Sequence, residues 1–147
     1  MPRVCLDMEI RAPAEAVWGA VIDIERYPAS MQNVRWVRIL DEESASVRRS
    51  AWSIVLKGAI LEWEERDHLD HGKRVMSFQQ VTGDLALFDG AWTVEERDAE
   101  LTHVALGITF EIGIPLLAAN LNPIAQRALH ANCTEMLLGV ERKVVGA

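Results

Sequence analysis

The sequence predicts a single α+β domain in which antiparallel strands are followed by one long helix. Apolar residues first alternate with period two, then follow a helical period, return to period two for most of the chain, and end in a long helical stretch. The connections between the predicted strands are too short for crossover helices, which indicates an antiparallel meander. The 147 residues fit one hydrophobic core, so we expect one domain over residues 1–147.

The N-terminal part predicts one strand and two short helices. Residues 4–10 alternate between apolar and polar side chains, as in a half-buried strand. Pro13 is suited to the start of a helix, which we expect over about residues 14–22. Asp23 is suited to cap a second short helix through residues 24–27.

Six further strands are expected between closely spaced turn signals rich in Gly, Asp and Ser. The predicted strands cover residues 34–40, 46–56, 60–69, 73–81, 85–96 and 102–112.

The last element is an amphipathic helix that we expect to end at about residue 143. After Pro115 the apolar period becomes 3.6, and Asn122-Pro123 has the form of a helix cap followed by proline at the first helical position. The predicted apolar stripe consists of Leu117, Leu121, Ile124, Ala128, Leu129, Cys133, Met136, Leu137, Val140 and Val144.

Composition excludes several classes of function. Fifteen Lys and Arg against 22 Asp and Glu give a net charge of −7, which disfavours binding to nucleic acid. The apolar runs are far shorter than the roughly 20 residues that a bilayer requires, and the N-terminus lacks a continuous apolar signal segment. We therefore expect a cytoplasmic protein without a transmembrane segment, whose oligomeric state the sequence leaves open.

The sequence predicts no metal site and no cofactor. Cys5 and Cys133 are far apart and have no histidine at ligand spacing, so we expect both to be buried small hydrophobic residues. The four histidines show no short ligand pattern, and His68 and His71 flank a predicted turn. Neither a phosphate-binding glycine loop nor a nucleophilic serine motif is present.

Four short motifs resemble a known superfamily across nearly the whole chain. They are APAEAVW (12–18), DIERYP (23–28), FDGAW (88–92) and GIP (113–115). The sequence is similar to START-like polyketide cyclase/dehydrase proteins and to coenzyme Q-binding (Coq10-like) proteins. The resemblance implies a helix-grip fold, a seven-stranded sheet curled around the C-terminal helix with a ligand cavity between them. It also implies a hydrophobic ligand such as a lipid, quinone or polyketide.

Alternation along the strands predicts an aromatic cavity wall that faces the C-terminal helix. We assign Trp63 to the inner face because a tryptophan is costly to leave in water. Gly90 leaves room in this wall, and Gln80 is a polar group suited to orient a ligand oxygen. The predicted ligand-binding residues are Trp63, Glu65, Met76, Phe78, Gln80, Phe88, Trp92, Leu106, Ile108, Phe110, Leu129 and Met136. For Trp18, Trp36 and Trp52, core packing and ligand contact both stay open.

Glu65 and Asp67 are the candidate catalytic residues, because alternation places them on the same face as Trp63. Two carboxylates beside an aromatic wall can raise one pKa and supply a general acid or base. The alternative is a structural role, with Asp67 in water at the strand end and Glu65 paired with a base. The cavity arginine and tyrosine of the superfamily's aromatase/cyclases are not matched, since those positions hold Asp67 and Val34.

The sequence thus predicts a domain that binds a hydrophobic or aromatic small molecule between its sheet and its C-terminal helix. The alternative is a polyketide aromatase/cyclase or dehydrase that uses the cavity carboxylates. Whether the protein catalyses a reaction stays open, because no unambiguous acid/base set is visible in the sequence.

Overall fold

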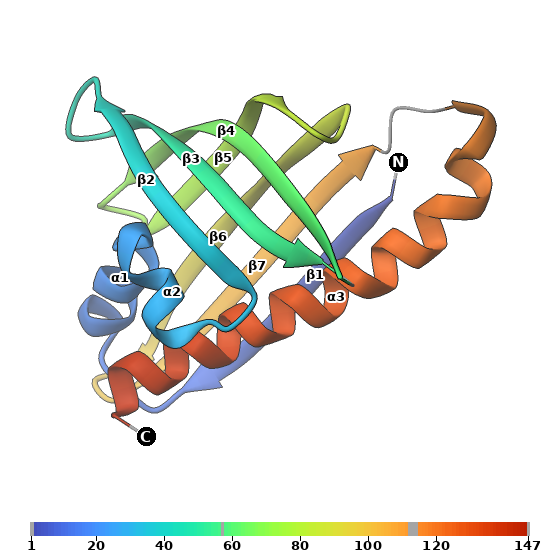
Figure 1. The fold of residues 1–147 in the computed structure, drawn as a ribbon. Helices are drawn as coiled ribbons and strands as arrows, with labels where there is room; N and C mark the ends of the chain where they lie inside the picture. Colours follow the sequence, from blue (N-terminus) through green and yellow to red (C-terminus); the bar gives the residue numbers. More distant parts are fainter. Residues whose placement is uncertain (1, 57, 112–114, 147) are drawn as a thin grey trace.

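A curled antiparallel sheet of seven strands grips one long helix (Figure 1). The computed structural model describes residues 2–56, 58–111 and 115–146, and in the last range it describes side chains from Pro123 onward. The elements are β1 (Arg3–Ile10), α1 (Ala14–Ile22), the 3₁₀ helix η1 (Ile24–Arg26), α2 (Tyr27–Ser30), β2 (Val34–Glu42), β3 (Val47–Leu56), β4 (Ala59–Asp70), β5 (Val75–Gly83), β6 (Leu87–Asp98), β7 (Leu101–Glu111) and α3 (Pro115–Val145). This arrangement confirms the predicted helix-grip fold.

The sheet is a meander with one long-range pairing. The strand order is β1-β7-β6-β5-β4-β3-β2, and all neighbouring strands are antiparallel. β1 pairs with β7 from Arg3 opposite Thr109 to Ile10 opposite Thr102. The segment α1–η1–α2 then connects β1, at one edge of the sheet, to β2 at the other. The short helices therefore lie beside the end of the curled sheet, where α1 and α2 both contact α3 (Figure 1).

The hydrophobic core lies between the inner face of the sheet and α3. Along β7 every second residue is buried, as the period-two pattern predicts. The buried stripe of α3 consists of Ala128, Leu129, Cys133, Met136, Leu137 and Val140. These residues recur at helical spacing, which is why the helix can cover a curved sheet with one face.

The predicted strand bounds need small corrections. β5 and β6 each begin two residues later than predicted, at Val75 and Leu87. The turn before β5 is longer than the sequence indicates because Arg74 has a positive φ of 55°, which is incompatible with a strand. Residue 112, the predicted end of the last strand, lies outside the described residues.

Three predictions about local environment are wrong. α3 begins at Pro115, so Pro123 lies inside the helix and Asn122 does not cap it. Ile124 is 48% exposed instead of part of the buried stripe, while the side chains of Leu117 and Leu121 lie outside the described residues. Cys5 is exposed on the outer face of β1, because Val4 takes the inward position there.

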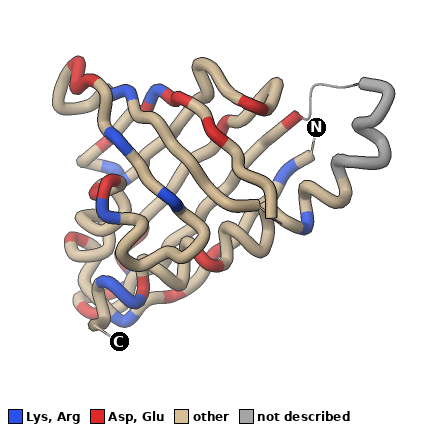
Figure 2. The backbone as a smooth tube through the Cα atoms, in the orientation of Figure 1, with Lys and Arg blue, Asp and Glu red and all other residues tan. Residues whose placement is uncertain are grey.

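Charged residues of both signs are interspersed over the hairpins and the outer strands (Figure 2). None of the helices in the described part of the chain is long and apolar enough to cross a membrane.

Candidate ligand cavity

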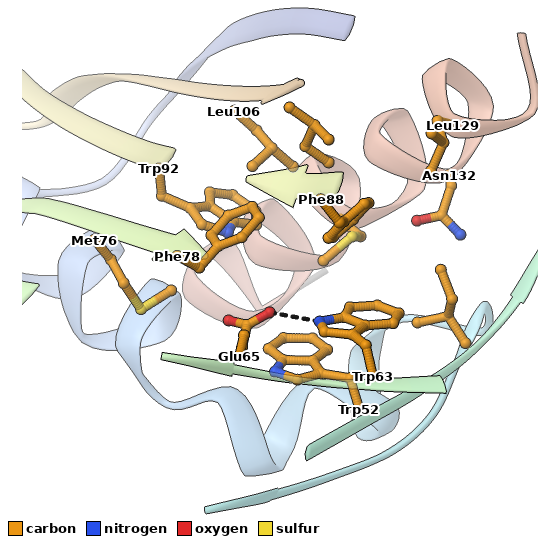
Figure 3. Close-up of a pocket in the computed structure, with 13 residues that line it drawn as sticks. Trp52, Trp63, Glu65, Met76, Phe78, Phe88, Trp92, Leu106, Leu129 and Asn132 are labelled. Carbon is orange, nitrogen blue, oxygen red and sulfur yellow. Dashed lines mark hydrogen bonds between the residues drawn. The ribbon is translucent and has the colours of Figure 1, made fainter. Parts of the chain in front are cut away.

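A cavity lies between the inner face of the sheet and α3 (Figure 3). Strands β3 to β7 supply most of its wall and α3 supplies the rest. Its wall consists of Trp52, Ile54, Trp63, Glu65, Met76, Phe78, Phe88, Trp92, Leu106, Ile108, Leu129, Asn132 and Met136. Among the wall residues that the structure describes, Glu65 and Asn132 are the ones with amide or carboxyl groups, so this wall is apolar apart from two points.

Aromatic rings form a continuous layer in this wall. The indoles of Trp52 and Trp63 stack with 5.7 Å between ring centroids and 6° between ring planes. Trp63 also contacts Phe88 at 4.9 Å, and Phe88 contacts Phe78 at 5.9 Å. Tyr27 from α2 packs edge-on against Trp52 behind the wall. Such rings offer large, rigid surfaces for a flat apolar ligand.

The wall side chains fill most of the space that they enclose. The hollow holds about 440 Å³ outside the atoms, part of it open to solvent, but only about 30 Å³ can hold the centre of a water molecule. The smaller volume is far below that of ordinary small-molecule sites, which usually measure roughly 300–1,000 Å³. A ligand of that size therefore has to displace side chains. Met76 and Met136 are suited to move because methionine is flexible and unbranched.

A buried carboxyl cluster lies at one side of the cavity, and we define it as Arg48, Ser50, Glu65 and Asp67. Asp67 Oδ2 accepts hydrogen bonds from Ser50 Oγ at 2.8 Å and from Arg48 Nε at 3.4 Å. Glu65 Oε1 accepts one from Trp63 Nε1 at 2.7 Å (Figure 3). Trp52 Nε1 donates to Ser50 Oγ at 2.9 Å, so both stacked indoles are bonded to the cluster.

Burial raises the pKa of Glu65 well above its usual value of 4.5, and the neighbouring Asp67 carboxyl raises it further. The hydrogen bond from Trp63 and the charge of Arg48 act in the opposite direction but do not cancel the rise. Burial likewise raises the pKa of Tyr27, which lies close to the cluster. The common cause is that burial disfavours the charged form of an acidic group.

Ten of the twelve predicted ligand-binding residues line the cavity, and two lie elsewhere. Gln80 donates from Nε2 to the carbonyl oxygen of Leu85 at 2.6 Å and lines a separate, smaller depression. Phe110 is completely buried in the core beyond the cavity. The room predicted at Gly90 is taken by the ring of Phe78, because a Cβ on Gly90 would lie 2.6 Å from Phe78 Cζ.

Both predicted structural roles for the carboxylates differ from the structure. Asp67 is completely buried, not in water, and it pairs with Arg48 behind the wall instead of lining the cavity. Glu65 is bonded to Trp63, not to a base. The inward face of β4 does carry Trp63, Glu65 and Asp67, while Glu62 and Glu64 face outward near Arg35 and Arg49.

Sequence reasoning missed Arg48 and Asn132, and it left Trp52 and Ile54 open between core packing and ligand contact. Arg48 has the same parity along β3 as Trp52 and Ile54, so its inward orientation was readable from alternation. A buried, inward-facing arginine requires an acidic partner, and this requirement could have predicted the pairing of Arg48 with Asp67. Asn132 lies one turn from Leu129 and Met136 on the apolar stripe of α3, where a polar side chain signals a site.

The remaining tryptophans lie outside the cavity wall. Trp36 lies on the face of β2 that is turned away from the cavity, where the Arg38 guanidinium is 4.4 Å from the ring centroid of Trp36. Trp18 donates from Nε1 to His71 Nδ1 at 3.3 Å, and His71 Nε2 lies 3.0 Å from the carbonyl oxygen of Ala45. Within the described ranges, no three His, Cys, Asp or Glu residues are grouped so that they could hold a metal ion.

The helix-grip fold thus places an apolar cavity under its long helix. Residues 10–137 match the family model described as polyketide cyclase/dehydrase and lipid transport, and the chain belongs to this family. It is 37% identical over 105 residues to the granaticin polyketide synthase bifunctional cyclase/dehydratase of Streptomyces violaceoruber. That alignment covers 70% of this chain but only 32% of the relative, so the chain spans about a third of that protein.

Solved structures share the fold over almost the whole chain. A protein from Thermus thermophilus, TTHA0849, is 27% identical with a TM-score of 0.90, and the match covers 99% of this chain and 98% of that one. The Zhui aromatase/cyclase from Streptomyces sp. R1128 is 24% identical with a TM-score of 0.77, covering 98% and 91% of the two chains. The second match supports the fold alone.

Proposed function

We propose that this domain binds a hydrophobic or aromatic small molecule in the cavity between its sheet and α3. The observation that carries the proposal is the composition of the wall, in which stacked and tilted aromatic rings surround two polar points, Glu65 and Asn132. This is the pattern expected of a site that gains affinity from apolar burial and orientation from a few polar groups. The family, whose description includes lipid transport, supports the same function.

The test is binding of a neutral aromatic probe, 2-ethylnaphthalene, followed by quenching of tryptophan fluorescence. Three of the five tryptophans line the cavity, so binding there has a direct signal. Trp63→Ala should weaken binding by about 5-fold to 150-fold, because one aromatic wall residue contributes roughly 1–3 kcal/mol of apolar burial. Native mass spectrometry of the purified protein should also detect a co-purified apolar molecule.

Trp36→Ala is the matched control, since it removes the same side chain from outside the cavity. It should leave the dissociation constant unchanged. Equal weakening by the two substitutions, or a wild-type protein that binds no apolar probe, would contradict a cavity site.

A second candidate function is catalysis of polyketide cyclisation or dehydration. It is favoured by the buried carboxyl of Glu65 in the cavity wall and by the cyclase/dehydratase relative. A carboxyl with a raised pKa can transfer a proton near neutral pH. Glu65→Gln should then abolish conversion of a linear poly-β-ketone while apolar binding is retained. Unchanged conversion in this variant would exclude Glu65 as the acid or base.

A further inference from the structure

The charges of the buried carboxyl cluster do not balance if both acids are ionised. Among the described residues, Arg48, Glu65 and Asp67 are the buried groups that are ordinarily charged at neutral pH, and Glu65 and Asp67 are 2% and 0% exposed. Two carboxylates and one guanidinium would leave a net negative charge beside an apolar cavity. Such a charge is strongly disfavoured there, so the cluster should retain one proton.

The hydrogen bonds indicate which carboxyl keeps this proton. Asp67 accepts from the Arg48 guanidinium and from the Ser50 hydroxyl, both of which stabilise its charged form. Glu65 accepts from one neutral donor, the indole of Trp63. Asp67 Oδ1 is buried and has no donor among the residues that the structure describes. A proton on Glu65 would supply the missing donor, since the two acids lie on the same face of β4.

The other elements around Glu65 offer no competing cation within the described residues. The cavity side chains of β5, β6 and β7 are apolar or aromatic, and the polar side chain that α3 contributes is the neutral Asn132. From α2 the titratable group is Tyr27, whose hydroxyl donates to the carbonyl oxygen of Val21. Arg48 is held by the Ile22 carbonyl oxygen at 2.8 Å as well as by Asp67, which directs it away from the cavity.

We propose that Glu65 is a neutral carboxylic acid at neutral pH and that its hydroxyl selects a neutral carbonyl oxygen of the ligand. The ligand class is an aromatic or polycyclic ketone. The selection of ligand rests on the proposed cavity function, whereas the protonation of Glu65 does not. A ketone oxygen would compete with Asp67 Oδ1 for this hydrogen, so its gain in affinity is smaller than that of one added hydrogen bond. A ligand carboxylate would instead place a second negative charge beside Asp67 and is rejected.

The first experiment is an infrared difference spectrum of wild-type protein minus Glu65→Gln, recorded in D₂O at pH 7. It should contain the C=O stretch of a protonated carboxylic acid. The control is Glu64→Gln on the outer face of β4, where the carboxylate pairs with Arg49 at 2.9 Å. That difference should contain carboxylate bands. Carboxylate bands in the Glu65 difference would overturn the proposal.

The second experiment compares the dissociation constants of 2-acetylnaphthalene, 2-ethylnaphthalene and 2-naphthoate. Wild-type protein should bind the ketone more tightly than the hydrocarbon, by less than the roughly 10-fold of one added buried hydrogen bond because Asp67 Oδ1 loses its donor, and it should bind the carboxylate most weakly. Glu65→Gln should keep this preference, because the amide donates a hydrogen bond and still accepts from Trp63. Glu65→Met should abolish it.

The outcomes separate the two proposals. Hydrocarbon binding without preference for the ketone, or a preference retained in Glu65→Met, overturns the role of Glu65 and leaves the apolar cavity intact. A ketone preference that appears only in Glu65→Gln would show that the wild-type carboxyl does not donate to the ligand, which also overturns the role of Glu65. If wild-type protein binds none of the three probes, cavity binding and ligand selection both fail, while the infrared spectrum still decides the protonation.

Discussion

Glu65 couples its own ionisation to the stability of the fold. Its pKa is raised in the folded protein, chiefly by burial, so the folded state binds a proton more tightly than the unfolded chain. The stabilisation from this proton is fully present below the unfolded pKa of about 4.5 and is lost as the pH rises through the folded pKa. The free energy of unfolding should therefore fall with rising pH across that window.

The prediction is a pH-dependent difference between wild-type protein and Glu65→Gln. Above pH 4.5 the wild type should lose up to about 1.4 kcal/mol per pH unit relative to the variant, until the pH exceeds the folded pKa. Urea unfolding at several pH values measures the free energy of unfolding of both proteins. Subtracting one from the other removes the contribution of the carboxylates that the two proteins share. A difference that is constant from pH 4.5 to 8 would mean that Glu65 ionises normally in the folded state.

Individual residues show what the sequence could and could not predict. The inward orientation of Trp63 follows from alternation, because an outward tryptophan among charges is costly. The pairing of Asp67 with Arg48 joins residues 19 positions apart on adjacent strands, so it depends on the register of β3 against β4. Alternation fixes the face of a strand but not this register, and the carboxyl cluster therefore emerges only from the three-dimensional structure.

At the scale of elements, α3 and α2 approach closely at Gly139. A Cβ at this position would lie 2.5 Å from Met31 Cγ and 2.8 Å from the carbonyl oxygen of Ser30. That oxygen also accepts a hydrogen bond from Arg142 at 2.6 Å, so it is not free to move. The position therefore requires a residue without a side chain, although glycine is unfavourable inside a helix.

Gly139→Ala should destabilise the protein by about 1–3 kcal/mol, as overpacking of a well-packed contact usually does. Gly19→Ala in α1 is the matched control, because a Cβ added at Gly19 would have no neighbouring atom within 4 Å. It should stabilise the protein by about 0.4–1 kcal/mol through the lower entropy of the unfolded chain. Urea midpoints of both variants measure the two signs, and stabilisation by Gly139→Ala would contradict the close approach.

The boundaries of elements were less predictable than their existence. The seven strands and the long helix follow from period changes and turn residues, which are local signals. The start of α3 does not, because Asn122-Pro123 carries a local start signal that the longer helix overrides. Pro123 is exposed, so its ring can lie on the outer side of the helix away from the sheet.

For the whole molecule, the grip of the sheet on α3 leaves a cavity that is almost filled by its own wall. Met136 from α3 reaches into the cavity, whereas its neighbour Leu137 is also buried but packs outside the wall. Truncating either residue removes buried apolar surface, but only truncation of Met136 adds space where a ligand would lie. Variants of these two residues can therefore distinguish an effect on the stability of the fold from an effect on the space available for a ligand.

Met136→Ala and Leu137→Ala should each lower the free energy of unfolding by about 2–5 kcal/mol. Met136→Ala should in addition bind 2-ethylnaphthalene more tightly than wild-type protein, because the ligand no longer has to displace that side chain. Saturating probe should then restore part of its lost stability, by about 2.7 kcal/mol at a probe concentration of 100 times the dissociation constant. Leu137→Ala should gain no affinity and recover less. Thermal unfolding of both variants with and without probe measures the stability that is restored. Equal recovery of stability in the two variants would mean that the probe binds outside the cavity between the sheet and α3.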